Sequence, residues 1–403
     1  MKFSKLSQLF LVSAIGLFLA TYLTACQIVT IDYVFVAASA GATPGSAGQI
    51  YTYAADAESG ALRAGPPPVA SGGTLPVAMA VTSDYANLYV ANQGNDSVVH
   101  FAIDNSGVLT QKDTITTSET PVSLAVNSAG TYLYVITGTA SATLTEYGLS
   151  SGAIGSQTAQ EKLMVPGYGS DTIISTGVTV LSNNNAVYVT AYDLSAYNPG
   201  QITTSSANPG WLFGFAVGSG GALTTATGSP YQAGVKPTAL AADPTDRFVY
   251  VTDYASNELI GYTIQSGSVL NFLVNGPFKT GNEPVSIVVD PRGLFIYIAD
   301  SLDSTVAAYD IALPTGTPSA IFATTGSSVN ATDTQPVSVI VDPALGRYVY
   351  TANHLGNSVS GFRLNPSTGV LEQTQATPYP TGSGPTAVIA VPHGNHATQT
   401  VTP

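Results

Sequence analysis

The stretch Tyr250-Val251-Thr252-Asp253 is one copy of a phrase that recurs seven times in this 403-residue chain, an apolar strand ending in Tyr-Val or its equivalent. The copies are Phe35-Val36, Tyr89-Val90, Tyr134-Val135, Tyr188-Val189, Tyr250-Val251, Tyr297-Ile298 and Tyr350-Thr351. Successive copies start 45 to 62 residues apart, the length of a four-stranded propeller blade with its loops. The repeat therefore predicts an all-β fold, a seven-bladed β-propeller of four-stranded antiparallel blades.

A second repeated element, an apolar strand that starts with Pro, precedes most of these copies, as in Pro284-Val285-Ser286-Ile287-Val288-Val289. It is apolar at nearly every position, as expected for a strand covered on both faces, so we predict it to be the innermost strand of each blade. Turns such as Asp290-Pro291-Arg292-Gly293 lead from it into the Tyr-Val strand. Hairpins that contain Gly, such as Asn105-Ser106-Gly107, then join the third strand to the fourth.

Each end of the chain has a strand that the other end lacks. Phe35 has no Pro-led strand before it, whereas Pro385-Thr386-Ala387-Val388-Ile389-Ala390-Val391 has no Tyr-Val strand after it. We expect this C-terminal strand to join the first blade and close the ring, because closure pairs both free sheet edges. The predicted propeller spans 31–391 and is followed by a polar tail, 392–403.

The N-terminus has the pattern of a secretory signal, which we assign to residues 1–25. Two lysines precede an apolar run, Leu9 to Leu19, that is too short for a comfortable membrane span. The sequence Leu23-Thr24-Ala25-Cys26 resembles the lipobox of bacterial lipoproteins, and Cys26 is the only cysteine of the chain. We therefore predict export and lipidation of Cys26.

The predicted lipid also indicates where in the cell the protein is located. Residues 26–30 form a short lipid-anchored tether, so the membrane is a partner through the N-terminal lipid. Gln27 resembles the sorting pattern for the outer membrane, so we expect the periplasmic side of that membrane or the cell surface. Removal of the signal leaves 9 basic residues against 24 acidic ones, a formal charge near −15. Such a surface repels phosphates, so we predict no nucleic-acid partner.

The phrases Tyr89-Val90-Ala91-Asn92, Tyr250-Val251-Thr252-Asp253 and Tyr297-Ile298-Ala299-Asp300 resemble the YVTN repeat. From about Ile31 to Val391 the chain resembles the seven-bladed lactonase-like propellers typified by 6-phosphogluconolactonase. The resemblance implies the propeller fold and, as an expectation, the opening of a lactone ring. Enzymatic members often carry Asn-Arg-Gly at the end of the second strand, but Asn92-Gln93-Gly94 and Asn353-His354-Leu355 lack the arginine.

The arginines of the chain also fail to converge where a phosphosugar would need them. Arg247, Arg292 and Arg347 all fall in turns between first and second strands. Those turns lie on the disc face opposite the loops between second and third strands. This argues against a phosphosugar substrate and leaves open a hydrolase that acts on an uncharged lactone.

Two insertions interrupt the repeat and enter or cross the fourth blade, Ser156 to Thr176 and Tyr192 to Gly210. Both should emerge on the same disc face, where they could form an aromatic and acidic rim for a glycan or a protein. The candidate ligand-binding residues are Tyr168, Asp171, Tyr192, Asp193, Tyr197 and Trp211. Loops without a ligand are the alternative.

For lactone opening, the candidate catalytic residues are His354, Glu283 and Asp300, on loops of neighbouring blades of that same face. A solvated loop histidine is the alternative for His354. Asp300 also recurs in register with other Asx residues, which suggests a turn. His393 and His396 have metal-type spacing but fall in the tail, so we predict no metal site and no cofactor; a divalent cation held around the channel stays open.

Two functions therefore remain. The first is an exported, lipid-anchored module that binds a glycan or a protein at the cell envelope. The alternative is a lactonase-type hydrolase, a carboxylic ester hydrolase. Binding should depend on Trp211 and Tyr197, whereas hydrolysis should require His354 or Glu283. The fold alone does not choose, because propellers host binders and enzymes alike.

Overall fold

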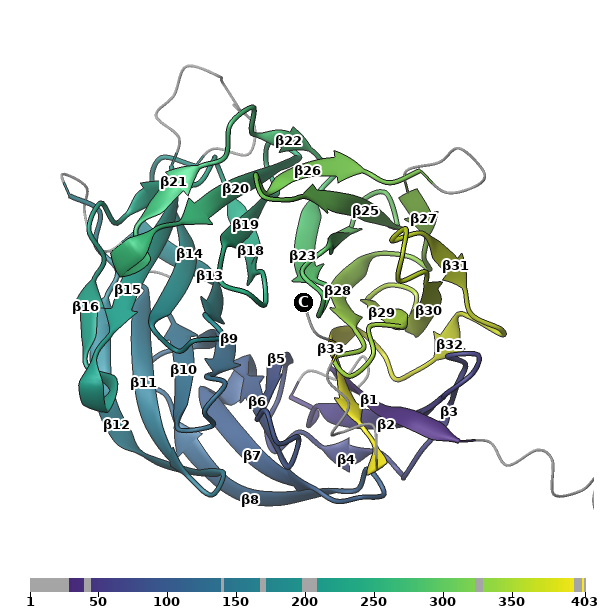
Figure 1. The fold of residues 1–403 in the computed structure, drawn as a ribbon. Helices are drawn as coiled ribbons and strands as arrows, with labels where there is room; N and C mark the ends of the chain where they lie inside the picture. Colours follow the sequence, from purple (N-terminus) through teal and green to yellow (C-terminus); the bar gives the residue numbers. More distant parts are fainter. Residues whose placement is uncertain are drawn as a thin grey trace, which may run out of the picture.

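Seven antiparallel sheets stand around a common axis, as predicted (Figure 1). The computed structural model describes residues 29–39, 45–138, 141–166, 172–197, 209–322, 329–394 and 401. Within these ranges helix is limited to single 3-10 turns, and no helix is long and apolar enough to cross a membrane. The sequence-based prediction of an all-β, seven-bladed propeller is confirmed.

Each blade runs from an inner strand at the axis to a fourth strand at the rim. The inner strands are β5 (Pro76–Val81), β9 (Pro121–Val126), β13 (Ile173–Val180), β18 (Pro237–Ala242), β23 (Pro284–Val289), β28 (Pro336–Val341) and β33 (Pro385–Pro392). The second strands, which carry the Tyr-Val phrase, are β1 (Thr30–Ala38), β6 (Asn87–Asn92), β10 (Tyr132–Thr137), β14 (Ala186–Asp193), β19 (Phe248–Asp253), β24 (Phe295–Asp300) and β29 (Tyr348–Asn353). The third strands are β2 (Gln49–Asp56), β7 (Ser97–Ile103), β11 (Thr143–Ser150), β15 (Gly210–Val217), β20 (Glu258–Ile264), β25 (Thr305–Ala312) and β30 (Ser358–Leu364).

The outer strand is continuous in two blades and split in the other five. The continuous strands are β8 (Leu109–Thr116) and β12 (Ala153–Lys162). The split pairs are β3 (Leu62–Ala64) with β4 (Val69–Ala70), β16 (Leu223–Thr225) with β17 (Tyr231–Gln232), β21 (Leu270–Phe272) with β22 (Phe278–Lys279), β26 (Thr317–Ala320) with β27 (Val329–Ala331), and β31 (Leu371–Gln373) with β32 (Tyr379–Pro380). Pro230, Pro277 and Pro378 lie in three of the breaks. Proline has no N–H to donate to the neighbouring strand, so the ladder ends there.

The ring closes through the two chain ends, which confirms the prediction made from counting strands. β33 pairs antiparallel with β1, with Val34 opposite Ala390 and Phe35 opposite Ile389 (Figure 1). The Thr386 hydroxyl donates to the Pro76 carbonyl of the next inner strand, at 2.7 Å. The C-terminal strand is therefore bonded both to its partner strand in the first blade and to the inner strand of the second blade.

The tyrosine of the Tyr-Val phrase forms a hydrogen bond to the neighbouring blade. The Tyr250 hydroxyl donates to the Gly316 carbonyl at 2.7 Å, in the hairpin of the next blade, and Tyr297 does the same to Gly369 at 2.9 Å. Three further pairs repeat the contact: Tyr89 with Gly152, Tyr188 with Ser268, and Tyr350 with Gly60. A buried carbonyl needs a donor, so this hydroxyl links five of the seven blades to the next one.

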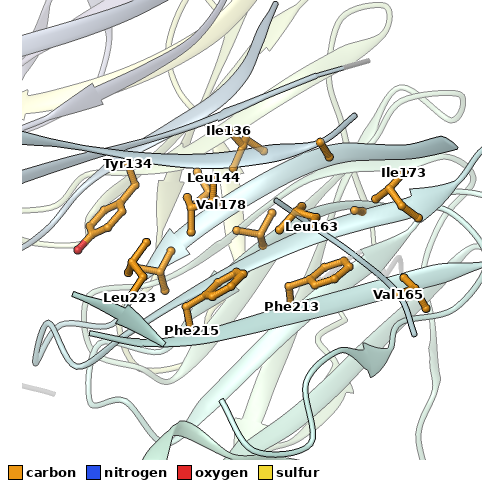
Figure 2. Close-up of a cluster of buried hydrophobic side chains, with 14 residues drawn as sticks. Tyr134, Ile136, Leu144, Leu163, Val165, Ile173, Val178, Phe213, Phe215 and Leu223 are labelled. Carbon is orange, nitrogen blue, oxygen red and sulfur yellow. The ribbon is translucent and has the colours of Figure 1, made fainter. Parts of the chain in front are cut away.

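Apolar side chains fill the space between neighbouring blades. Between the third and fourth blades, Leu144, Val178, Phe213 and Phe215 lie in one cluster (Figure 2). The inner strands differ from expectation, because they are buried on one face only. Their other face lines a central channel with a cavity of about 310 Å³, so it stays partly exposed.

Candidate functional site

We call one face of the disc the channel mouth. It carries the loops that join the second strand of each blade to the third, and the loops that join the fourth strand to the inner strand of the next blade. Two repeated positions meet there. The residue before the inner strand accepts, through its carbonyl, the N–H of the residue that follows the second strand. Examples are Lys236 with Tyr254 at 3.0 Å and Gln335 with His354 at 2.7 Å. The backbone is thus constant around the mouth, while the side chains at these positions differ from blade to blade.

Lys236 lies among three tyrosine rings at the mouth. Its Nζ is 4.4 Å from the ring centroid of Tyr254, 5.3 Å from that of Tyr197 and 5.8 Å from that of Tyr192. The rings of Tyr192 and Tyr197 meet edge to face, with centroids 5.4 Å apart. Burial lowers the pKa of Lys236, although the charge of Glu283 acts in the opposite direction. Such a geometry stabilises an ammonium group through the electron-rich ring faces.

Glu283 completes this group, which we call the tyrosine cluster: Tyr192, Tyr197, Tyr254, Lys236 and Glu283. Burial, followed by the nearby Glu283 carboxylate, raises the pKa of Tyr254 to about 12. Burial, Asp253 and Glu283 together raise the pKa of Tyr197. All five side chains of the cluster are half-buried, so each presents part of its surface to solvent. The cluster therefore combines aromatic faces, one cation and one carboxylate at one place.

Asp253, at the end of β19, positions the lysine of the cluster. Its carboxylate accepts the N–H groups of Val235 at 2.7 Å, Lys236 at 2.9 Å and Ala255 at 3.1 Å. The approach is close, since a Cβ at Gly234 would lie 2.1 Å from the carboxylate. Asp253 thereby holds the loop that carries Lys236 against the strand end that precedes Tyr254.

Of the predicted ligand-binding residues, Tyr192 and Tyr197 belong to the tyrosine cluster. Asp193 is buried and accepts the Ser195 N–H at 2.9 Å and the Ser195 hydroxyl at 2.7 Å. Burial acts to raise the pKa of Asp193, but hydrogen bonds from Thr172 and Ser195 prevail and lower it. Asp193 therefore stabilises its own loop. Trp211 lies on β15, half-buried, and packs against the apolar cluster between the third and fourth blades. The other two predictions, Tyr168 and Asp171, lie outside the described residues.

The three predicted catalytic residues occupy separate environments. His354 Nδ1 donates to the Pro385 carbonyl at 3.1 Å, which leaves Nε2 as the nitrogen available to a ligand. Asp300 is fully buried at the end of β24. Its carboxyl has no hydrogen-bond partner, and burial, followed by the charge of Asp303, raises its pKa to about 8. Among the described residues no hydrogen bond or ion pair joins His354, Glu283 and Asp300, whereas Glu283 lies in the tyrosine cluster.

Lys236 and Tyr254 were not among the predicted site residues. Lys236 directly precedes the Pro that starts an inner strand, and Tyr254 directly follows a repeated Asx residue. A comparison of these two positions across all blades would have identified both as departures from the repeat. Within the described part of the chain no three His, Cys, Asp or Glu residues gather as a metal site. His393 packs edge to face on Tyr33 at 4.9 Å, and its predicted companion His396 lies outside the described residues.

Comparisons with known proteins match this architecture. The family model described as Lactonase, 7-bladed beta-propeller matches residues 63–168 and 194–395. No curated protein matches the chain. Among solved structures, a candidate 6-phosphogluconolactonase of Bacteroides uniformis has a TM-score of 0.71 at 17% identity, covering 90% of this chain and 100% of that one.

Two further structures give the same picture. The periplasmic gluconolactonase of Pseudomonas aeruginosa has a TM-score of 0.71 at 16% identity, over 90% of this chain and 99% of the other. A candidate 6-phosphogluconolactonase of Bacteroides fragilis has a TM-score of 0.70 at 19% identity, over 90% and 98%. At such low identity the structural likeness concerns the fold.

Proposed function

Because the chain belongs to the seven-bladed lactonase β-propeller family, we propose that the tyrosine cluster at its channel mouth binds a sugar or a sugar-derived ring. The observation that carries the proposal is the placement of three half-exposed tyrosine rings around Lys236, with Glu283 beside them. Aromatic rings offer flat apolar faces to the C–H groups of a sugar, and an ammonium and a carboxylate bind its hydroxyls. The cluster supplies all of these groups.

Binding is tested by titrating the purified full chain with N-acetylglucosamine oligomers, cellobiose and gluconate, followed by calorimetry. We expect Tyr197→Ala and Lys236→Met each to weaken binding by about tenfold, roughly the loss of one stacked ring or one charged hydrogen bond. Phe272→Ala is the matched control, because Phe272 is an exposed aromatic residue on the outer strand β21. Affinities that are the same in both cluster variants as in the wild type would exclude the cluster as the site.

A second candidate function, lactone opening at the same cluster, is favoured by one observation. Lys236 has a lowered pKa and lies close to Glu283. In this proposal Glu283 takes a proton from water as the oxygen attacks the lactone carbonyl. The ring C–O bond then breaks, and the Lys236 ammonium donates its proton to the departing ring oxygen. The product is the open hydroxy acid, so atoms and charge balance.

Hydrolysis is tested with a panel of uncharged and phosphorylated lactones. Loss of more than a hundredfold in turnover is expected for Glu283→Gln, the loss of a general base. His354→Ala distinguishes catalysis at the tyrosine cluster from catalysis by His354. If His354 is catalytic, turnover should fall more than a hundredfold in that variant as well. No turnover of any lactone by the wild type would leave binding as the function of the cluster.

We further propose that the protein is exported and carries lipid on Cys26, as its N-terminal sequence predicts. Glycan binding at the cell envelope then follows as the role of the module. Incorporation of radiolabelled palmitate into the wild type, and its absence from Cys26→Ser, is the expected result. Equal labelling of the two proteins, or none in either, would contradict the assignment.

A further inference from the structure

A cavity of about 790 Å³ lies on the disc face opposite the channel mouth, between the last blade and the first. Its walls come from the β2–β3 hairpin, the turn before β29, and the end of β30 with the hairpin that follows. The lining residues that matter here are Glu58, Arg347, Tyr348, Arg363, Leu364 and Glu372. None of them belongs to the tyrosine cluster, so the cavity is a separate site.

Two arginines of this cavity, Arg347 and Arg363, have exposed side chains. Neither guanidinium has a hydrogen bond or ion pair to the described residues. They nevertheless lie near each other, because both line this cavity and both lower the pKa of Tyr348, against the larger effect of burial. Arg363 is the cross-strand partner of Tyr348, and Arg347 directly precedes it in the chain. Arg363 lies opposite Glu372 in the register of β30 and β31, and the charge of Arg347 acts on Asp342, so carboxylates lie near both arginines without an ion pair that fixes either guanidinium among the described residues.

The corresponding arginines of the preceding blades behave differently. Arg247 pairs with Asp243 at 2.9 Å and donates to the Gly293 carbonyl in the turn of the next blade. Arg292 likewise pairs with Asp290 at 3.2 Å and donates to two carbonyls of the next turn. Those arginines are structural links between consecutive blades.

The position of the ring closure explains why the Arg347 guanidinium has no hydrogen bond to the described residues. The next turn around the ring would join β33 to β1, but these two strands belong to opposite ends of the chain. Within the described residues no turn offers carbonyls to the Arg347 guanidinium there. Among the described residues, the Arg347 guanidinium therefore lacks the carbonyl partners that Arg247 and Arg292 have.

We propose that this cavity is a binding site for a hydroxylated organic anion, whose carboxylate or phosphate is held by Arg347 and Arg363. Guanidinium groups bind both kinds of anion with two parallel hydrogen bonds. Glu58 and Glu372, at the cavity wall, accept hydrogen bonds from ligand hydroxyls, and they discriminate against anions without hydroxyls. Pro366 and Val370, which also line the cavity and are partly open to solvent, contact the carbon skeleton.

The test is titration of the full chain with glucuronate, glucose 6-phosphate and, as the neutral counterpart, glucose. We expect one or both anions to bind, with affinity that falls as salt rises, and we expect Arg347→Ala and Arg363→Ala each to weaken binding at least tenfold. Lys112→Ala removes an exposed positive charge on another blade and should leave binding unchanged. Because both arginines are exposed and unpaired, the variants should fold, and thermal unfolding verifies this.

The two anions distinguish the sources of the ligand: tighter glucuronate binding indicates a sugar acid, and tighter glucose 6-phosphate binding indicates a phosphate ester. Lys236→Met separates this site from the channel mouth, since anion binding here should survive that change. The proposal is overturned if the wild type binds neither anion, or if the double variant of Arg347 and Arg363 binds them as the wild type does.

Discussion

Replacement of Asp300 by Asn should stabilise this protein, and the gain should grow with pH. Asp300 is buried at the end of β24, and no donor reaches either of its carboxyl oxygens with hydrogen-bond geometry, although the Gly281 N–H nearby offsets part of the effect of burial. Burial and the charge of Asp303 raise its pKa to about 8, from an ordinary value of 3.8. Asn already occupies the equivalent position in β6 and β29, as Asn92 and Asn353. The fold therefore accepts an amide there.

The direction and the magnitude of this change in the free energy of unfolding follow from the linkage between protonation and folding. Because the folded protein holds this proton more tightly than the unfolded chain, unfolding releases it between pH 4 and pH 8. The free energy of unfolding therefore falls as pH rises through this window and is constant above it. Each pH unit corresponds to about 1.4 kcal/mol, so the penalty that Asp300→Asn removes is at most about 4 kcal/mol at pH 7. Near pH 3 the carboxyl is neutral in both states, and the pH-dependent gain is absent.

The assay is urea unfolding of wild type and variant at pH 4, 7 and 9, compared as differences at each pH. Asp253→Asn is the matched control, because Asp253 occupies the same register position but accepts three backbone N–H groups. Loss of these charged hydrogen bonds should destabilise the protein by about 2–3 kcal/mol at pH 7. A stability difference for Asp300→Asn that does not change between pH 4 and pH 9 would refute the reasoning.

Three further substitutions test the contacts between blades, each by urea unfolding. Tyr297→Phe leaves the buried Gly369 carbonyl without its donor and should cost about 1–2 kcal/mol; no loss would mean that water replaces the hydroxyl. Asp32→Asn should stabilise, increasingly so above pH 4, because burial and the charge of Asp342 raise the pKa of Asp32; a destabilised variant at pH 8 would contradict this. Gly60→Ala should cost roughly 2–4 kcal/mol, since its φ is +69° and a Cβ would lie 2.2 Å from a tyrosine ring; a wild-type midpoint would disprove that contact.

The repeat made most of the fold predictable from the sequence. Inner strands begin at proline in six of the seven blades, and the second strands carry Tyr-Val or its equivalent. These are local patterns, and sevenfold repetition removes the ambiguity that a single copy would have. Ring closure by 385–391 followed from counting alone. The sequence did not predict that one face of each inner strand would line an open channel. A strand covered on both faces and a strand that lines a channel have similar apolar composition.

The candidate site was only partly predictable. Tyr192, Tyr197 and Glu283 were predicted for this face, but as members of two different sites. Lys236 and Glu283 are 47 residues apart and belong to consecutive blades, so their proximity depends on how the blades pack around the axis. Nothing local to either residue marks it as part of a cluster.

Residues with the same place in the repeat show most clearly what tertiary structure alone decided. Asp253 and Asp300 end equivalent strands, yet three N–H groups form hydrogen bonds to the Asp253 carboxylate, whereas Asp300 has only the Gly281 N–H nearby, outside hydrogen-bond geometry. Arg292 binds carbonyls of the next turn, whereas no turn within the described residues offers carbonyls to the Arg347 guanidinium at the ring closure. The sequence by itself determined the blades, their number and their order. Which loop backbone reaches which side chain was decided by the packing of one blade on the next, because ångström-scale loop positions depend on contacts distant in sequence.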